Sequence, residues 1–242
     1  GYRDNLYVAA PILRRNGLVA TIMLATGFIT HGYNQPIDDL YTYFSNRTRE
    51  EFVLPNDDLD DSRRSLDLQV PSQLRFAYKF CDNRLTTSNT ETRVQLLKYV
   101  ERQLRPTLCA PRLMLNWDEI RELHTTYPEI EIGVHTAQHL DLSLASQDMI
   151  ASEIQQCVND VVREVGFRPR HFVFPYNRSN ALARCIVKNF GFQSAMGRSG
   201  SSLVNSKVDL YGLPRTDARM SDTQFKLRTH SSFGSLPDPL RN

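Results

Sequence analysis

Apolar positions along the chain alternate between short continuous runs and helix-like stripes. The runs LVATIML (18–24), EIEIGV (129–134), HFVFPY (171–176) and FQSAM (192–196) predict buried strands. Apolar residues three and four apart predict helices over 4–17, 116–128, 146–166 and 179–191. Asp4 is a candidate cap of the first helix, Asn116 and Glu119 have the spacing of a capping box in the second, and Gly166 ends the third.

The alternation breaks between residues 33 and 112. This stretch offers one clear amphipathic helix, TETRVQLLKYVERQL (90–104), with an apolar stripe of Val94, Leu97, Val100 and Leu104. Its acidic cluster, Asp57, Asp58, Asp60 and Asp61, lacks the Gly and Glu of a calcium loop and is interpreted as a solvated loop. We interpret 33–112 as an insertion within one domain that spans 1–242.

Strands that alternate with helices through short connections predict an α/β fold with a parallel sheet or barrel. In such folds the functional side chains collect at the carboxyl ends of the strands. The residues that follow two of the predicted strands, His135 and the pair Pro175 and Tyr176, are therefore the first candidates for a site.

Composition narrows the classes of function. The 242 residues carry 29 basic and 27 acidic side chains, and this balance gives no reason to expect a nucleic-acid partner. No apolar run approaches the ~20 residues of a membrane span, so no transmembrane segment is predicted. The four cysteines lie far apart, and Cys157 and Cys185 fall on apolar helix faces, which favours buried free thiols over disulfides.

His135 and His139 are spaced for a metal site. On a helical turn, residues four apart share one face and can present two imidazoles to one ion. Catalytic zinc takes three protein ligands and water, so two histidines need a third partner. The residues alone leave a second interpretation open, in which Thr136 and the histidines only complete the hydrogen bonding of a loop.

Four segments, in order, carry a resemblance to a known family. They are GYRDNLYVAAPILRRNGLVATIMLATGFI (1–29), the segment around HTAQH (135–139), FRPRHFVFPYN (167–177) and DLYGLPRTDA (209–218). Together they resemble the NodB-homology polysaccharide deacetylases, a family of metal-dependent carbohydrate esterases. The resemblance implies a distorted (β/α) barrel, a divalent metal with zinc first among the candidates, an N-acetylated polysaccharide substrate, and a cell-envelope or secreted location.

The resemblance also assigns roles to residues. His135 and His139 match the metal-binding histidines, and Tyr176 matches the residue whose backbone N–H stabilises the oxyanion. Pro175 fixes the turn that holds that N–H against the substrate. Many members have an arginine where this chain has Val173. Arg215 is a candidate for the missing charge, with a plain surface arginine as the alternative.

The family's Thr-Phe-Asp-Asp motif, which holds the general base and the third metal ligand, stands immediately before a Gly-Tyr pair. This chain begins at Gly1 and Tyr2, so we expect its first strand to be incomplete and the chain as given to be inactive. The family's Leu-x-His motif is not matched, because His230 in KLRTH has the wrong spacing. A non-catalytic glycan- or partner-binding relative and a hydrolase of small amides remain alternatives.

Overall fold

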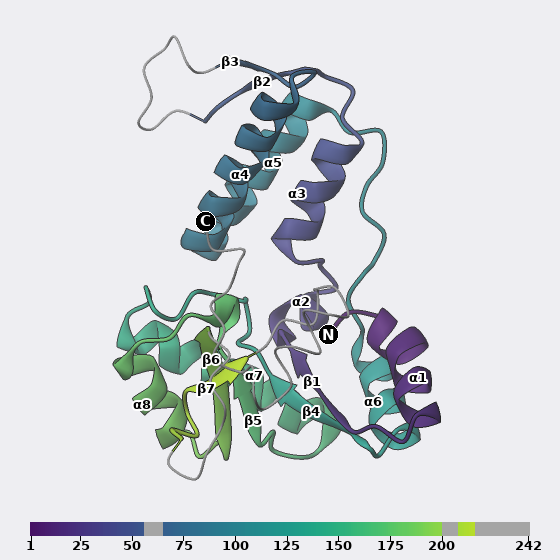
Figure 1. Ribbon diagram of the computed structural model, residues 1–242, viewed down its shortest axis with the longest axis vertical. Coiled ribbons are helices and arrows are strands. Elements are labelled where there is room, and N and C mark those ends of the chain that lie inside the picture. Colours follow the sequence, from purple (N-terminus) through teal and green to yellow (C-terminus); the bar gives the residue numbers. More distant parts are fainter. Residues whose placement is uncertain (56–64, 200–207, 216–242) are drawn as a thin grey trace, which may run out of the picture. The chain divides into compact units, whose positions relative to one another are not determined.

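A computed structural model describes residues 1–55, 65–199 and 208–215 (Figure 1). The chain divides into two compact units. The first comprises Gly1, Arg3–Thr30 and the described residues from Asn116 onward, and the second comprises Tyr2 and His31–Leu115. The predicted insertion at 33–112 falls within the second unit, and the single-domain interpretation stays a prediction. The acidic cluster at 57–61 and His230 lie outside the described residues.

A parallel sheet forms the centre of the first unit. Its strands are β1 (Ala20–Leu24), β4 (Ile130–Val134), β5 (His171–Val173), β6 (Ser194–Ser199) and β7 (Leu213–Arg215), in the order β1-β4-β5-β6-β7. Every neighbouring pair is parallel. The predicted α/β class is therefore confirmed. Among the described strands β1 and β7 lie at the edges, so closure into a barrel stays a prediction.

The register places two chain segments side by side at the carboxyl ends of neighbouring strands of this sheet. Strands β1 and β4 pair from Ala20 with Ile130 through Leu24 with Val134, and Val134 pairs with Phe172 of β5. Since β4 and β5 are parallel neighbours, the residues that follow them leave the sheet at the same end. The two predicted motifs therefore start next to each other.

Helices flank the sheet. They are the π-helix η1 (Asn5–Ala9), α1 (Ala10–Arg15), α2 (Thr26–His31), α6 (Trp117–Thr126), α7 (Gln147–Val165) and α8 (Ala181–Asn189), the last of which packs beside β6 (Figure 1). The predicted capping box of Asn116 and Glu119 is present. No helix in the described part of the chain is long and apolar enough to cross a membrane.

The predicted cap by Asp4 is wrong. Its backbone angles, φ −61° and ψ −21°, are already helical, and its side chain makes no capping hydrogen bond. A capping side chain needs the extended backbone that points it back at the first free N–H groups. The prediction for Cys185 is also wrong in part: all four cysteines are free thiols, but Cys185 and Cys109 are exposed.

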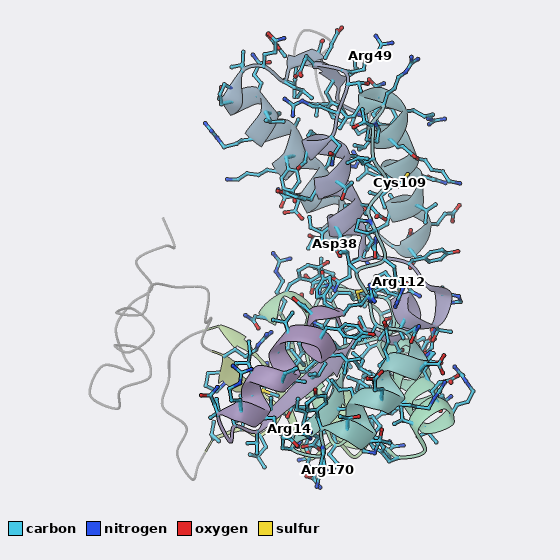
Figure 2. All side chains as sticks on the ribbon, turned by 90° about the vertical axis from the view of Figure 1, so that its right-hand side faces the viewer. Arg14, Asp38, Arg49, Cys109, Arg112 and Arg170 are labelled. Atoms are coloured by element: carbon cyan, nitrogen blue, oxygen red, sulfur yellow. The ribbon has the colours of Figure 1, made fainter. Side chains whose placement is uncertain are left out.

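Three helices and a hairpin build the second unit. The helices α3 (Pro36–Ser45), α4 (Pro71–Thr87) and α5 (Thr90–Leu104) run alongside one another, with a hairpin of β2 (Glu51–Val53) and β3 (Ser65–Asp67) (Figure 1). Leu40, Phe52 and Val100 are completely buried in its core. Arg49 and Cys109 are exposed on this unit (Figure 2).

Helix α5 has the predicted bounds but buries a different stripe. The buried residues are Arg93, Leu96, Val100 and Leu104, while Val94 is 46% exposed. Arg93 takes a core position because its Nε donates to the Leu85 carbonyl at 2.7 Å. A hydrogen-bonded arginine can lay its apolar stem in a core, and this moves the stripe by about one position.

Candidate metal and substrate site

Three rings gather where the chain leaves β4 and β5. The ring centroids of His135 and His139 are 4.6 Å apart, at an interplanar angle of 80°. The ring of Tyr176 lies 4.7 Å from that of His139, at 77°. The structure thus brings together the two predicted metal ligands and the predicted oxyanion residue, which are about 40 positions apart in the sequence.

A backbone carbonyl fixes the tautomer of His135. The Nδ1 atom of His135 lies 2.6 Å from the Val173 carbonyl oxygen. A carbonyl can only accept, so Nδ1 carries the proton and Nε2 keeps its lone pair. This is the arrangement that a metal-binding histidine needs, since the ring nitrogen opposite the ligating one donates to a fixed acceptor.

The surroundings of His135 keep its ring uncharged. Burial lowers the pKa of His135 to about 4, and the positive charge of Arg215 acts in the same direction. The hydrogen bond to Val173 opposes this shift. At neutral pH the imidazole is therefore neutral and available as a ligand.

Four of the strained backbone positions of the described chain lie in these two loops. Thr136 and His139 have φ values of 64° and 51°, and Tyr176 and Asn177 both have 57°. Left-handed angles at non-glycine residues cost on the order of 1–3 kcal/mol each and persist where the surroundings hold them. The strain is thus concentrated on the segments that carry the predicted site residues.

Pro175 and Tyr176 lie in the short 3₁₀ turn η3 (Pro175–Asn177), directly after β5. Arg215 reaches this turn from the end of β7, where its Nη1 donates to Asn177 Oδ1 at 2.7 Å. Val173 is a buried strand residue and carries no charge. Arg215 therefore supplies a positive charge beside the Tyr176 turn.

A buried carboxylate joins the two loops. Asp141, whose side chain is 2% exposed, accepts from the backbone N–H and the hydroxyl of Ser143 and from Arg178 Nη1 at 2.9 Å. Asn180 also donates to the Ser143 carbonyl at 3.0 Å. These contacts fix the Tyr176 turn against the histidine loop. Asp141 and Arg178 were not predicted from the sequence, because nothing in their spacing pairs them.

The donor set agrees with a metal site in part. The two imidazoles can face one ion, and Thr136, which stands between them, is completely buried with a hydroxyl that has no hydrogen-bond partner among the described residues. Within residues 1–55, 65–199 and 208–215, however, no group of three or more His, Cys, Asp or Glu side chains could hold a metal ion. His135 and His139 thus fit as two ligands of a larger set.

The start of the chain lies near this site. The Gly1 amino group donates to the Met23 carbonyl in β1 at 3.1 Å, and burial lowers its pKa to about 5. Residues attached ahead of Gly1 would therefore begin beside β1. This geometry allows the family's aspartates to be tested by extending the chain at Gly1.

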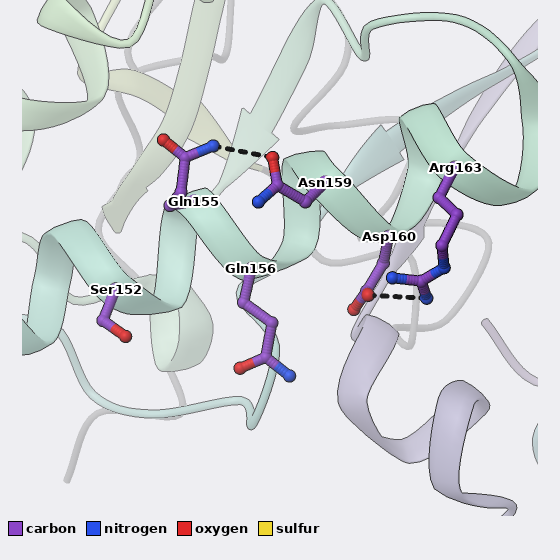
Figure 3. A pocket seen from close by; sticks show the side chains of 6 residues that line it. All are labelled: Ser152, Gln155, Gln156, Asn159, Asp160 and Arg163. Atoms are coloured by element: carbon purple, nitrogen blue, oxygen red, sulfur yellow. Dashed lines mark hydrogen bonds and ion pairs between the residues drawn. The ribbon is translucent and has the colours of Figure 1, made fainter.

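A hollow on the surface of α7 is separate from the predicted site residues. It has a volume of about 360 Å³ and is lined by Ser152, Gln155, Gln156, Asn159, Asp160 and Arg163 (Figure 3). Gln155 bonds to Asn159, and Asp160 pairs with Arg163. The lining contains none of the predicted site residues.

Part of the chain matches the model of a known protein family. The polysaccharide deacetylase family model matches residues 83–195, a range that includes both histidines and the Pro175–Tyr176 turn. The resemblance predicted from the sequence is thereby confirmed over these residues, and structures of polysaccharide deacetylases share the fold. No curated protein matches the chain.

Solved structures of deacetylases share the fold. The Streptococcus pyogenes deacetylase PplD, solved in complex with acetate, aligns with a TM-score of 0.52 at 14% identity, over 88% of this chain and 59% of its own. A de-N-acetylase from Aggregatibacter actinomycetemcomitans gives 0.52 at 14% identity, over 93% and 71%. The BpsB deacetylase domain from Bordetella bronchiseptica gives 0.50 at 10%, over 89% and 67%. The chain thus spans less than two thirds of the Streptococcus protein.

Proposed function

We propose that this chain is part of a metal-dependent deacetylase that hydrolyses N-acetyl groups of amino sugars in a polysaccharide. One observation carries the proposal. The hydrogen bond to Val173 leaves the Nε2 lone pair of His135 available, and the ring centroid of His135 lies 4.6 Å from that of His139. Both rings follow the carboxyl end of β4, and the Tyr176 turn follows the carboxyl end of the neighbouring strand β5. The match to the polysaccharide deacetylase family model supports the hydrolase class. The substrate and the metal dependence are part of the proposal, as is a cell-envelope or secreted location.

Each of the predicted site residues has its own role in this proposal. His135 and His139 hold a divalent metal, with zinc preferred for its affinity for imidazole nitrogen. When bound, such an ion polarises the acetyl carbonyl and lowers the pKa of water. The Tyr176 backbone N–H faces the oxygen that becomes negative, and one such donor contributes about 3 kcal/mol to transition-state stability. Pro175 locks the start of the turn, and Arg215 holds Asn177 at its end.

The test compares two chains. One is the 242-residue chain, and the other carries Thr-Phe-Asp-Asp ahead of Gly1. Each is given zinc and an N-acetylglucosamine oligomer, and the released acetate is measured. We expect acetate from the extended chain alone, because the added aspartates supply the base and the third ligand.

Two variants of the extended chain complete the test. His139→Ala should abolish the release, whereas His124→Ala, which removes an exposed histidine of α6, should leave it unchanged. Acetate release that survives His139→Ala would sink the proposal. Binding of the oligomer that persists in a chelator, without any hydrolysis, would favour the glycan-binding alternative.

A further inference from the structure

A buried carboxylate on α7 holds the loop between the two histidines. Glu153 is 8% exposed, and its Oε2 accepts from the backbone N–H of Ala137 at 3.0 Å and of Gln138 at 2.8 Å. These are two consecutive peptide groups between His135 and His139. Glu153 lies on the apolar face of α7, close to Ile150, Ile154 and Cys157. Glu153 was not predicted from the sequence.

The carbonyl groups of the same loop are held from the opposite direction. Thr26 N–H donates to the Thr136 carbonyl at 3.3 Å, and Gly27 N–H donates to the Ala137 carbonyl at 2.9 Å. A Cβ atom on Gly27 would lie 2.8 Å from that carbonyl oxygen and 2.5 Å from Gln138 Nε2, so only glycine allows this approach. The start of α2 and Glu153 therefore clamp the loop through its backbone.

An ionised carboxylate suits this position. Two N–H donors converge on one oxygen, and charged acceptors form hydrogen bonds roughly twice as strong as neutral ones. Without an acceptor, both N–H groups would lose their partner in the interior, next to the left-handed Thr136 and His139. Such angles persist only where the surroundings over-determine them.

We propose that Glu153 is a positioning residue that sets the separation and direction of His135 and His139 for a shared divalent metal. The metal part of this inference rests on the proposed function. Glu153 contacts the backbone of the loop and acts through it on the two rings. Partners of this kind typically contribute 10–100-fold to metal affinity.

The first experiment measures metal affinity. Co²⁺ is titrated by its absorption spectrum, and Zn²⁺ by competition, into the chain extended by Thr-Phe-Asp-Asp ahead of Gly1 and into variants of that chain. Glu153→Ala should weaken binding by about 10–100-fold, and Glu153→Gln, which keeps a neutral acceptor, by a smaller factor.

Glu119→Ala is the matched control. Glu119 is also a buried helical carboxylate, 7% exposed, and it accepts from Asn116 N–H, Arg3 and Tyr7. This variant should lower the melting temperature and leave the metal affinity unchanged. Equal losses of affinity in Glu153→Ala and Glu119→Ala would overturn the proposal, as would wild-type affinity in both Glu153 variants.

The second experiment needs no metal. Amide hydrogen exchange is measured on the metal-free chain, where Glu153→Ala should speed exchange at Ala137 and Gln138 far more than along α7. If Glu153→Ala does not fold, Glu153→Gln should show the same local effect at smaller size. Unchanged protection at these two amides overturns the positioning role. An extended chain that binds no metal while this local effect is present would instead refute the proposed function.

Discussion

At the scale of single residues, the site depends on the neutral state of His135. Burial and the nearby positive charge of Arg215 make protonation of this ring unfavourable in the folded chain, whereas in the unfolded chain it titrates normally. As the pH falls, the unfolded state therefore takes up this proton first. The free energy of unfolding must therefore fall in the same pH range.

The predicted consequence is a loss of stability in mild acid. The folded pKa of His135 is about 4 and its ordinary value is 6.5, so the free energy of unfolding should fall as the pH drops from 6.5 toward 4. The full effect is at most about 3 kcal/mol. Urea unfolding with chelator present, at several pH values, would measure it. His135→Gln should show a shallower pH dependence, and an unchanged slope in that variant would refute the assignment.

The residues that bear the predicted chemistry could be found from the sequence, while their supports could not. His135, His139, Pro175 and Tyr176 follow apolar runs, and parallel pairing of β4 and β5 brings them together. Glu153 and Asp141 act through partners chosen by the folded backbone, which spacing does not encode. The contact of Arg215 with Asn177 shows the same limit, since the folded backbone brings the end of β7 to this turn.

At the scale of elements, helix ends give a paired prediction. Gly166 and Arg105 both occupy left-handed positions at helix ends, with φ values of 86° and 44°. Gly166→Ala should destabilise the chain by about 1 kcal/mol, and Arg105→Gly should stabilise it by up to about 1 kcal/mol, because only glycine adopts these angles without strain. Chemical denaturation of both variants tests this, and a change of the same sign in both would contradict it.

The link between the two loops gives a second prediction at this scale. Arg178→Met removes the charged partner of the buried Asp141 carboxylate and should destabilise the chain by about 1–3 kcal/mol. Asp141→Asn in the Arg178→Met background should cost less than it does in the wild-type chain, because the two side chains act together. A double-mutant cycle from urea unfolding measures their coupling. Strictly additive effects would show that the pair does not hold the loops together.

The strength of the apolar pattern decided which elements were predicted. Helix α7 buries a continuous face of seven residues between Ile150 and Val161 and was predicted within one or two residues. Helix α4 was missed, because its 17 residues bury only Ala77, Cys81 and Leu85. Helix α3, which buries Leu40 and Phe44, was also missed.

At the scale of the whole molecule, the second unit has a core of its own. Eleven buried residues between Leu40 and Leu104 form one cluster. We therefore predict that a fragment of residues 31–115 folds alone into a helical unit. Circular dichroism with thermal melting measures this. A cooperative transition is expected, and a featureless melt would show that the core depends on the rest of the chain.

The proposed function depends most directly on whether His135 and His139 bind the same metal ion. Zinc titration by calorimetry, on the chain extended by Thr-Phe-Asp-Asp ahead of Gly1 and on its His135→Ala and His139→Ala variants, tests it most directly. We predict one zinc ion per extended chain and the loss of that binding in each variant. Zinc binding with unchanged stoichiometry and affinity in both variants would contradict it.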